Sequence, residues 1–533
     1  MLDCRVACAP RNDERWIMKD SYYITTPIYY VNDKPHLGHA YTSVACDALA
    51  RFMRLDGAEV KFLTGTDEHG QKVEKSARAS GVEPQEFVDA VSEHFREMGE
   101  VLQLSNDDFI RTTQPRHITA AQAIWKALEA SGDIYLGSYA GWYSVRDEAF
   151  YAESELVDGK APTGAEVEWV EEPSYFFKLS KYQQPLLDYY KAHPDFILPE
   201  SRRNEIIRFV EGGLHDLSIS RTTFKWGVPV PGDEKHIMYV WLDALTNYLT
   251  AVGYPDVQAA EYQQFWPASL HMVGKDIVRF HAVYWPAFLM SAKLPVPQRI
   301  FAHGWWTIEG EKMSKSLGNV VAPTHLVERY GLDQTRYFLL REVPFGSDGN
   351  FSRQAMFDRI NADLANNIGN LAQRTLSMIA KNCDGVLPGN DTAALTEADT
   401  ALMELVRVTN AGTPKSAREQ MQRCKFGEVT GAILAMASAA NEYIDREAPW
   451  KLKKENPERM EAVLYYLAEA IRCIAIMLQP FTPGAAEKLL DQLAVPKDQR
   501  LFKHLTAEFA LVPGTPLPKP EGVFPRLVVE EGA

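Results

Sequence analysis

The first part of the chain alternates between strand-like and helix-like spacings of its apolar residues. Residues 22–26 are β-branched and aromatic and end at Pro27, which predicts a buried strand. Apolar side chains then recur at helical spacing over residues 37–55, and a second strand-like run follows over residues 59–65. A strand, a helix and a strand in this order form a right-handed parallel unit. We therefore expect a doubly wound, Rossmann-like α/β domain with a parallel sheet.

This spacing changes twice further along the chain. From about residue 135, two short runs over 135–139 and 141–144 and many Tyr, Trp, Gly and Glu residues predict an inserted, strand-rich domain. The α/β pattern returns near residue 236. After about residue 355, long Ala-, Leu- and Met-rich segments at helical spacing predict an α-helical bundle, and prolines then indicate an extended tail.

Composition restricts the class of protein. The hydrophobic fraction of 46% and the charged fraction of 24% are ordinary for a soluble protein, and no apolar run approaches the roughly 20 residues of a membrane helix. The six cysteines form no CxxC pair, which favours a reducing compartment, the cytoplasm. The net charge of −15 argues against general nucleic-acid binding but leaves room for a local basic surface.

Two histidines flank a glycine where the first strand gives way to the first helix. In His36-Leu37-Gly38-His39, Gly38 allows a nucleotide to approach the backbone, and the start of the helix offers N–H groups to phosphate. His36 and His39 could stabilise charge on the phosphates as pyrophosphate leaves. A chance match or a metal pair on one helix face is the alternative, but no third ligand lies at zinc-like spacing.

The stretch from Lys312 to Ser316 is a second candidate for polyphosphate binding. Lysine acts on phosphate as a mobile point charge, although a lysine pair alone is more often a solvated charge run. The five residues, which include Lys315, match a signature of the class I aminoacyl-tRNA synthetases without a mismatch, and the histidine motif matches the other signature. The two motifs together resemble that class.

Residues between these motifs are candidates for the amino-acid site. Asp67 follows the second strand, where ligands of parallel sheets bind, and suits a substrate ammonium group, although Asp beside Gly is also common in turns. Two predicted helix faces are aromatic, and their members are Trp241, Ala244 and Tyr248 on one and Ile277, His281 and Trp285 on the other. Such faces are more often plain hydrophobic core, but as a pocket they suit a polarizable thioether.

From about Ser21 to about residue 510, the chain resembles the methionyl-tRNA synthetase family. The similar segments are residues 25–32, 65–70, 240–244 and 274–281. The resemblance implies that Asp67 holds the methionine ammonium group and that the six residues of the two aromatic faces hold its side chain. It also implies catalytic roles for four residues, which are His36, His39, Lys312 and Lys315. The implied ATP-binding residues are Gly38, Gly274, Asp276 and Lys315.

The activity implied by this resemblance has two steps. ATP, together with Mg²⁺, activates L-methionine to methionyl-adenylate, and the methionyl group then passes to tRNA(Met). Two other classes stay open at this point: a class I synthetase for a different amino acid, and a tRNA-binding paralogue that has lost catalysis.

The helical region carries the implied anticodon-binding residues. Asn370 and Arg374 can share a helix face, and Trp450 follows a proline. Asn and Arg hydrogen-bond base edges, and Trp offers a stacking surface for an unpaired base. A core aromatic is the alternative for Trp450.

The chain also departs from the family pattern. Many relatives bind zinc through cysteines of the inserted domain, but residues 47–382 contain no cysteine, and residues 142–150 stand where CxxC would fall. We expect no structural zinc and no other metal site, with Arg146 pairing with Asp147 or Glu148 instead. The chain has no room for the dimerising domain of some relatives, which implies a monomer without a membrane partner.

These expectations define seven parts of the chain. They are a disordered leader (1–20), the catalytic domain in two halves (21–134 and 231–297), an inserted connective domain (135–230), a stem-contact region with the lysine loop (298–355), an anticodon-binding helical bundle (356–510) and a C-terminal tail (511–533).

Overall fold

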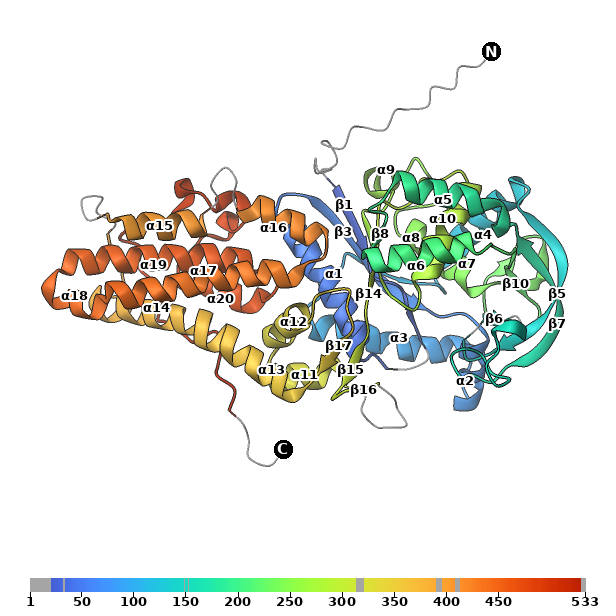
Figure 1. The fold of residues 1–533 in the computed structure, drawn as a ribbon, viewed down its shortest axis with the longest axis horizontal. Coiled ribbons are helices and arrows are strands. Elements are labelled where there is room, and N and C mark those ends of the chain that lie inside the picture. The colour runs from blue at the N-terminus through green and yellow to red at the C-terminus, as the bar shows by residue number, and fades with distance from the viewer. Residues whose placement is uncertain are drawn as a thin grey trace, which may run out of the picture.

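The computed structural model describes residues 21–31, 34–147, 149–151, 153–312, 321–389, 395–407 and 413–528. Figure 1 shows an elongated molecule in which a lobe built around a sheet adjoins a lobe of long helices. The expected leader and Lys315 lie outside the described residues.

The central sheet has seven strands, and every pair of neighbours in it is parallel. Along the sheet the order is β2-β3-β1-β13-β14-β8, with β4 also paired to β3. The bounds are β1 Ser21–Thr25, β2 Tyr29–Tyr30, β3 Glu59–Asp67, β4 Asp108–Arg111, β8 Ile197–Leu198, β13 Leu270–Gly274 and β14 Ile300–His303. This arrangement confirms the expected doubly wound fold.

Alternating side chains along these strands enter two different cores. Ile24 and Phe62 pack on one face with helix α1 (Leu37–Leu55), whereas their neighbours Tyr23 and Leu63 pack on the other face with α4 (Pro115–Ala130). Successive side chains of a strand point to opposite faces of the sheet. A strand with apolar side chains at consecutive positions therefore needs other elements packed on both faces of the sheet. Helix α1 begins and ends where the sequence predicts.

The inserted region forms a sheet of its own, which lies at one end of the molecule (Figure 1). Its four antiparallel strands are β5 Ile134–Ser144, β6 Ala149–Tyr151, β7 Glu168–Phe177 and β9 Leu217–Ser218. The two short strands expected over 135–139 and 141–144 are one strand, β5. Strand β8 lies within the range 135–230 and yet pairs with β14 of the central sheet, so this range contributes to both sheets.

The strand near residue 236, where the α/β pattern is expected to return, lies outside the central sheet. Strand β12 (Asp233–Met238) pairs antiparallel with β10 (Ser220–Arg221) and β11 (Pro229–Val230) in a separate sheet, and β13 is the next strand of the central sheet. Local spacing predicts a strand but carries no information about its partner, because pairing is a contact between distant segments.

The remaining helices of this lobe surround the central sheet. Their bounds are α2 Gln71–Ser80, α3 Pro84–Val101, α5 Gln183–Ala192, α6 Glu200–Glu211, α7 Val240–Leu245, α8 Asn247–Thr250, α9 Ala260–Phe265, a π-helical turn at Phe280–Tyr284, and α10 Trp285–Ser291.

A small three-stranded sheet and two helices connect the lobes. They are β15 Trp306–Ile308, β16 Glu311–Lys312, β17 Gly349–Phe351, α11 Pro323–Tyr330 and α12 Leu332–Arg341.

The second lobe is helical, as expected. Its elements are α13 Arg353–Arg359, a π-helical segment Ile360–Gly369, α14 Asn370–Asn382, α15 Glu397–Val406, α16 Thr413–Gln422, α17 Phe426–Glu447, α18 Pro449–Glu455, α19 Pro457–Leu478 and α20 Pro483–Gln492. Helix α19 is buried along almost its whole length and forms the centre of the bundle. The proline-rich tail folds back on the bundle, where Phe524 is buried and Asn361 hydrogen-bonds to Leu527.

A buried ion pair connects the two lobes. Arg336 of α12 donates to the carboxylate of Asp47 in α1 over 2.6 Å and to the carbonyls of Leu102 and Pro480 over 3.1 Å each. Both charged side chains are 0% exposed. One guanidinium thus connects the helix that carries the histidine motif to the turn that precedes α20.

We predict that Arg336→Ala destabilises the protein strongly. The substitution removes the fully buried partner of Asp47 and the hydrogen bonds to two backbone carbonyls, and breaking a buried ion pair in this way costs about 3–5 kcal/mol. Urea denaturation followed by circular dichroism measures the loss. Arg51 pairs with the same carboxylate over 2.7 Å but is 26% exposed, so Arg51→Ala is the matched control. An equal loss in both variants contradicts the prediction.

Candidate active site

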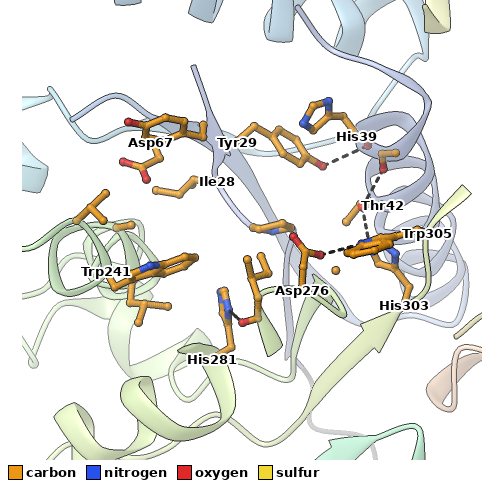
Figure 2. Close-up of a pocket in the computed structure, with 18 of the residues that line it drawn as sticks. Ile28, Tyr29, His39, Thr42, Asp67, Trp241, Asp276, His281, His303 and Trp305 are labelled. Carbon is orange, nitrogen blue, oxygen red and sulfur yellow. Dashed lines mark hydrogen bonds between the residues drawn. The ribbon is translucent and has the colours of Figure 1, made fainter. Parts of the chain in front are cut away.

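A cavity of about 620 Å³ lies at the carboxyl ends of the central strands, where ligands of such sheets bind. It is shown in Figure 2. The last residues of β3, β13 and β14, which are Asp67, Gly274 and His303, all line it. It also brings together most of the predicted site residues, namely His36, Gly38, His39, Trp241, Ala244, Tyr248, Asp276, Ile277 and His281.

His36 and His39 cap the first helix with one ring nitrogen each. The backbone N–H of Gly38 donates to Nδ1 of His36 over 3.0 Å, and the backbone N–H of His36 donates to Nδ1 of His39 over 3.1 Å. A nitrogen that accepts a hydrogen bond carries no proton, so each neutral ring bears its proton on Nε2. Burial, followed by the charge of His36, lowers the pKa of His39 well below its usual range. Both rings are therefore prepared to donate from Nε2.

Gly38 has a steric role in this cap. A Cβ at this position would lie 2.9 Å from Cε1 of the His36 ring, so a larger residue would displace the imidazole. The close approach of a nucleotide, for which the sequence suggested this glycine, stays a prediction.

Hydrogen bonds hold Asp67 at the end of β3 and the residue that follows it. Its carbonyl accepts from the N–H of Val31 over 3.2 Å, and Asp67 is buried at the end of β3. The next residue, Glu68, is buried and accepts from Arg111 over 2.6 Å and from Thr66 over 2.7 Å. The carboxylate of Asp67 therefore faces the cavity from a backbone that has little freedom to move.

The aromatic wall of the cavity is built by stacking and by one buried hydrogen-bond chain. Trp241 stacks on Phe280 with ring centroids 3.8 Å apart. His281 donates from Nδ1 to the carbonyl of Ile277 over 3.0 Å, so its Nε2 accepts from the hydroxyl of Tyr248 over 2.8 Å. Burial lowers the pKa of His281 to about 4, which keeps the ring neutral near pH 7.

Trp285 is the one predicted pocket residue among the described ones that does not line the cavity. It is completely buried behind Tyr248, with ring centroids 6.2 Å apart. The prediction assumed α-helical spacing from Ile277, but residues 280–284 form a π-helical turn, which rotates the following residue to another side.

Several residues that the sequence reasoning missed line the cavity. Nε2 of His303 lies 2.7 Å from the hydroxyl of Thr42, and Trp305 donates from its indole to Asp276 over 3.1 Å (Figure 2). Burial lowers the pKa of His303. Gly274 leaves room for Asp276, because a Cβ there would lie 2.5 Å from the carboxylate. A histidine at the end of a buried strand was the signal that could have found His303.

Of the two predicted lysines, the structure describes the backbone of Lys312 alone. Lys312 is the last residue of β16, which pairs antiparallel with β15. Lys315 belongs to residues 313–320, outside the described part of the chain.

The predicted anticodon-binding residues come together on the helical lobe. The guanidinium of Arg374 lies 5.5 Å from the ring of Trp450 and pairs with Asp445 over 2.6 Å. Asn370 is exposed at the start of the same helix, α14. Trp450 is 45% exposed, which excludes a role as a core aromatic.

Hydrogen bonds around Asp147 hold the segment in which the sequence analysis expected an ion pair in place of zinc. Arg146 pairs with Asp147 over 3.1 Å, as predicted, and the same carboxylate accepts from the hydroxyls of Tyr151 and Thr163. Glu148 lies outside the described residues. Among the residues that the structure describes, no three His, Cys, Asp or Glu side chains are grouped as metal ligands would be.

Two family models match the chain. Residues 22–167 and 161–376 match tRNA synthetases class I (M), and residues 390–533 match the anticodon binding domain of methionyl tRNA ligase. The chain belongs to the methionine–tRNA ligase family. The resemblance drawn from the two motifs is confirmed, and this family excludes a class I synthetase for a different amino acid.

Individual relatives of the methionine–tRNA ligase family match over nearly the full chain. The enzyme of Mesorhizobium japonicum is 58% identical over 97% of this chain and 99% of its own, and that of Rickettsia bellii is 58% identical over 96% and 99%. The Mycobacterium tuberculosis methionyl-tRNA synthetase in complex with methionyl-adenylate matches with a TM-score of 0.92 at 52% identity, covering 96% of this chain and 100% of that one. Its apo form matches with a TM-score of 0.86 at 48% identity, covering 96% and 99%.

Over the described residues, no helix is both long enough and apolar enough to span a bilayer.

Proposed function

We propose that this methionine–tRNA ligase uses ATP to convert L-methionine to methionyl-adenylate and then transfers the methionyl group to the terminal ribose of tRNA(Met). The observation that carries the proposal is that the histidines that cap α1, a buried carboxylate and an aromatic wall line one and the same cavity.

Methionine binds at the end of the cavity that Asp67 and Trp241 line. The carboxylate of Asp67 accepts from the substrate ammonium group, and the methylthio group packs against Trp241, Ala244 and the pair of Tyr248 and His281. Because His281 is neutral and its Nδ1 donates to a carbonyl, this wall presents no charge to the thioether. Sulfur packs favourably on aromatic rings, which supports this orientation.

The nucleotide occupies the opposite side, between Gly274, Asp276 and the histidine cap. Asp276 accepts from a ribose hydroxyl, while Gly38 leaves the start of α1 open to phosphate. ATP enters with Mg²⁺. The methionine carboxylate attacks the α-phosphorus, and the bond to the bridging oxygen breaks as pyrophosphate leaves. Nε2–H groups of His36 and His39 donate to the developing negative charge, and Lys312 and Lys315 neutralise the pyrophosphate.

The test of the proposed reaction is ATP–pyrophosphate exchange with a panel of amino acids. We expect exchange with methionine and little with leucine, isoleucine, valine or cysteine. Absence of exchange with every amino acid, combined with retained binding of tRNA(Met), indicates a paralogue that has lost catalysis.

The anticodon of tRNA(Met) binds the surface formed by Asn370, Arg374 and Trp450. The exposed indole offers a stacking face, and the guanidinium beside it offers donors to base edges.

We predict that Trp450→Ala lowers kcat/KM for tRNA charging by roughly 10- to 100-fold, because base–aromatic stacking contributes about 1–3 kcal/mol. ATP–pyrophosphate exchange needs no tRNA and stays unchanged. Steady-state charging with tRNA(Met) and exchange, measured on the same preparation, separate the two effects. Trp169, an exposed tryptophan of the inserted domain, supplies the control variant Trp169→Ala. A loss of exchange in Trp450→Ala contradicts the separation.

We also propose a cytoplasmic monomer without structural zinc. The cysteines of the described chain, Cys46, Cys383, Cys424 and Cys473, are free thiols, which supports a reducing compartment. Size-exclusion chromatography with light scattering tests the monomer, and elemental analysis of the purified protein tests for zinc.

A further inference from the structure

Two histidines and an aspartate form a buried cluster behind the amino-acid end of the cavity. Nδ1 of His69 lies 2.6 Å from one carboxylate oxygen of Asp243, and Nε2 of His117 lies 2.7 Å from the other. Nδ1 of His117 is 3.2 Å from the hydroxyl of Thr250. All three members of the cluster are buried, and none of them lines the cavity.

The cluster joins the two segments that carry the amino-acid site. His69 is two residues after Asp67 in the loop that follows β3. Asp243 lies in α7, between Trp241 and Ala244, and α7 is only six residues long. His117 belongs to α4, which packs against the sheet and gives the cluster a fixed support. Asp243 therefore connects the proposed ammonium-binding loop directly to the proposed side-chain wall.

Asp243 connects the two segments through an ionised carboxylate. Burial alone would raise the pKa of its carboxyl, but the charge and hydrogen bonds of His69 and His117 lower that pKa to about 2. An ionised carboxylate that accepts from an imidazole on each oxygen forms stronger and more directional bonds than a neutral pair does. Both oxygens are occupied, so the loop and α7 cannot shift independently of each other.

The loop has a second set of contacts that limits its movement. The indole of Trp226 donates to the carbonyl of Glu68 over 2.6 Å, and the N–H of Gly70 donates to the carbonyl of Trp226 over 3.1 Å. Gly70 has φ of 115°, a backbone conformation that favours glycine. The contacts of the cluster and of Trp226 therefore hold the loop after Asp67 at a defined position relative to α7, which carries the aromatic wall.

We propose that His69, Asp243 and His117 are positioning residues that select the amino acid by the length of its side chain. The proposal rests on the roles proposed above for Asp67 and for the wall of Trp241 and Ala244. A substrate held by its ammonium group at one end must fill the distance to the wall at the other. A pocket of fixed depth discriminates against one extra methylene by roughly 10- to 200-fold, and this requires both ends to be fixed.

L-Ethionine, which carries an S-ethyl group in place of the S-methyl group, measures that depth. In ATP–pyrophosphate exchange we expect His69→Ala and Asp243→Asn to raise the KM for methionine by roughly 10- to 100-fold, as expected for loss of a buried charged hydrogen bond. We expect the KM for ATP to change by less than about 3-fold. The ratio of kcat/KM for ethionine to that for methionine should rise by about 10-fold. His69→Gln, whose side-chain N–H can still donate to Asp243, should recover most of the selectivity.

Asp133 supplies the matched control. It is an equally buried carboxylate in the same lobe, and it accepts from Tyr182, Lys181 and Ser291 without contacting either segment of the amino-acid site. Asp133→Asn should lower the melting temperature about as much as Asp243→Asn and leave the ethionine ratio unchanged. The proposal is overturned if Asp243→Asn also leaves this ratio unchanged, or if it raises the KM for ATP as much as that for methionine.

Asp67→Asn separates this inference from the proposed function. If the KM for methionine is unaffected in Asp67→Asn, the proposed amino-acid site itself is wrong. If Asp67→Asn raises that KM while the cluster variants keep the wild-type ethionine ratio, only the inference about the cluster fails.

Discussion

Replacing Asp67 by asparagine raises the KM for methionine by roughly 100-fold or more, because the substrate ammonium group loses its partner in a site shielded from water. Breaking one side of a buried, hydrogen-bonded charge pair costs about 2–5 kcal/mol. The asparagine side chain keeps the shape of the aspartate it replaces, so the loop held by Glu68 and Arg111 remains in place. ATP–pyrophosphate exchange at saturating ATP measures the KM for methionine, and exchange at saturating methionine measures that for ATP.

Asp276→Asn is the reciprocal variant. Asp276 lines the same cavity, but it lies beside Gly274 and accepts from the indole of Trp305 on the proposed nucleotide side. We expect it to raise the KM for ATP by about 10-fold and to change that for methionine by less than about 3-fold. Equal effects of the two variants on both substrates would show that the cavity is not divided between amino acid and nucleotide.

Replacing Lys315 by alanine lowers the rate constant of methionyl-adenylate formation by roughly 100- to 1,000-fold, the loss expected when one group that stabilises transition-state charge is removed. The dissociation constant of methionine should change by less than about 2-fold, because the lysine acts on phosphate and not on the amino acid. Rapid quench of a single turnover measures the rate constant. Quenching of tryptophan fluorescence measures methionine binding, since Trp241 lines the cavity.

Lys191 supplies a control for the loss of a lysine charge. It lies on the surface of α5, outside the residues that line the cavity, so Lys191→Ala should react at the wild-type rate. An unchanged single-turnover rate in Lys315→Ala contradicts its proposed role. A parallel loss of methionine affinity would instead indicate that the lysine acts on the arrangement of the whole site.

The elements that the sequence predicts well are those with local causes. Helix α1 begins at Leu37 because His36 caps it through its own neighbour Gly38, and it ends at Leu55, two residues before Gly57. Strand β3 has the apolar residues Phe62 and Leu63 at consecutive positions, which indicates burial on both faces. Asp67 could be predicted as a site residue because it lies at the carboxyl end of this strand, and the carboxyl ends of parallel strands meet at one edge of the sheet, whereas Gly274 was implied by the family resemblance alone.

The differences between expectation and structure come from features that residue spacing alone does not show. Trp285 was placed in the pocket by counting along an α-helix, and a single π-helical turn moved it into the core. Strand β12 was predicted as a strand but belongs to a different sheet. Nothing in the sequence near Asp243 indicates that His69 and His117 reach its two oxygens, because these residues are brought together by the packing of three separate segments.

The sequence by itself indicated the class of enzyme through its resemblance to a known family, which the histidine and lysine motifs carry, and the two aromatic faces suited the side chain of methionine. Only the tertiary structure decided which of those aromatic side chains enter the cavity and what holds them at a fixed distance from Asp67. Patterns in the sequence reflect hydrogen bonding and burial within one segment of the chain. The depth of a pocket is a distance between different segments, so these patterns do not determine it. In this protein that distance depends on one buried carboxylate and two imidazoles.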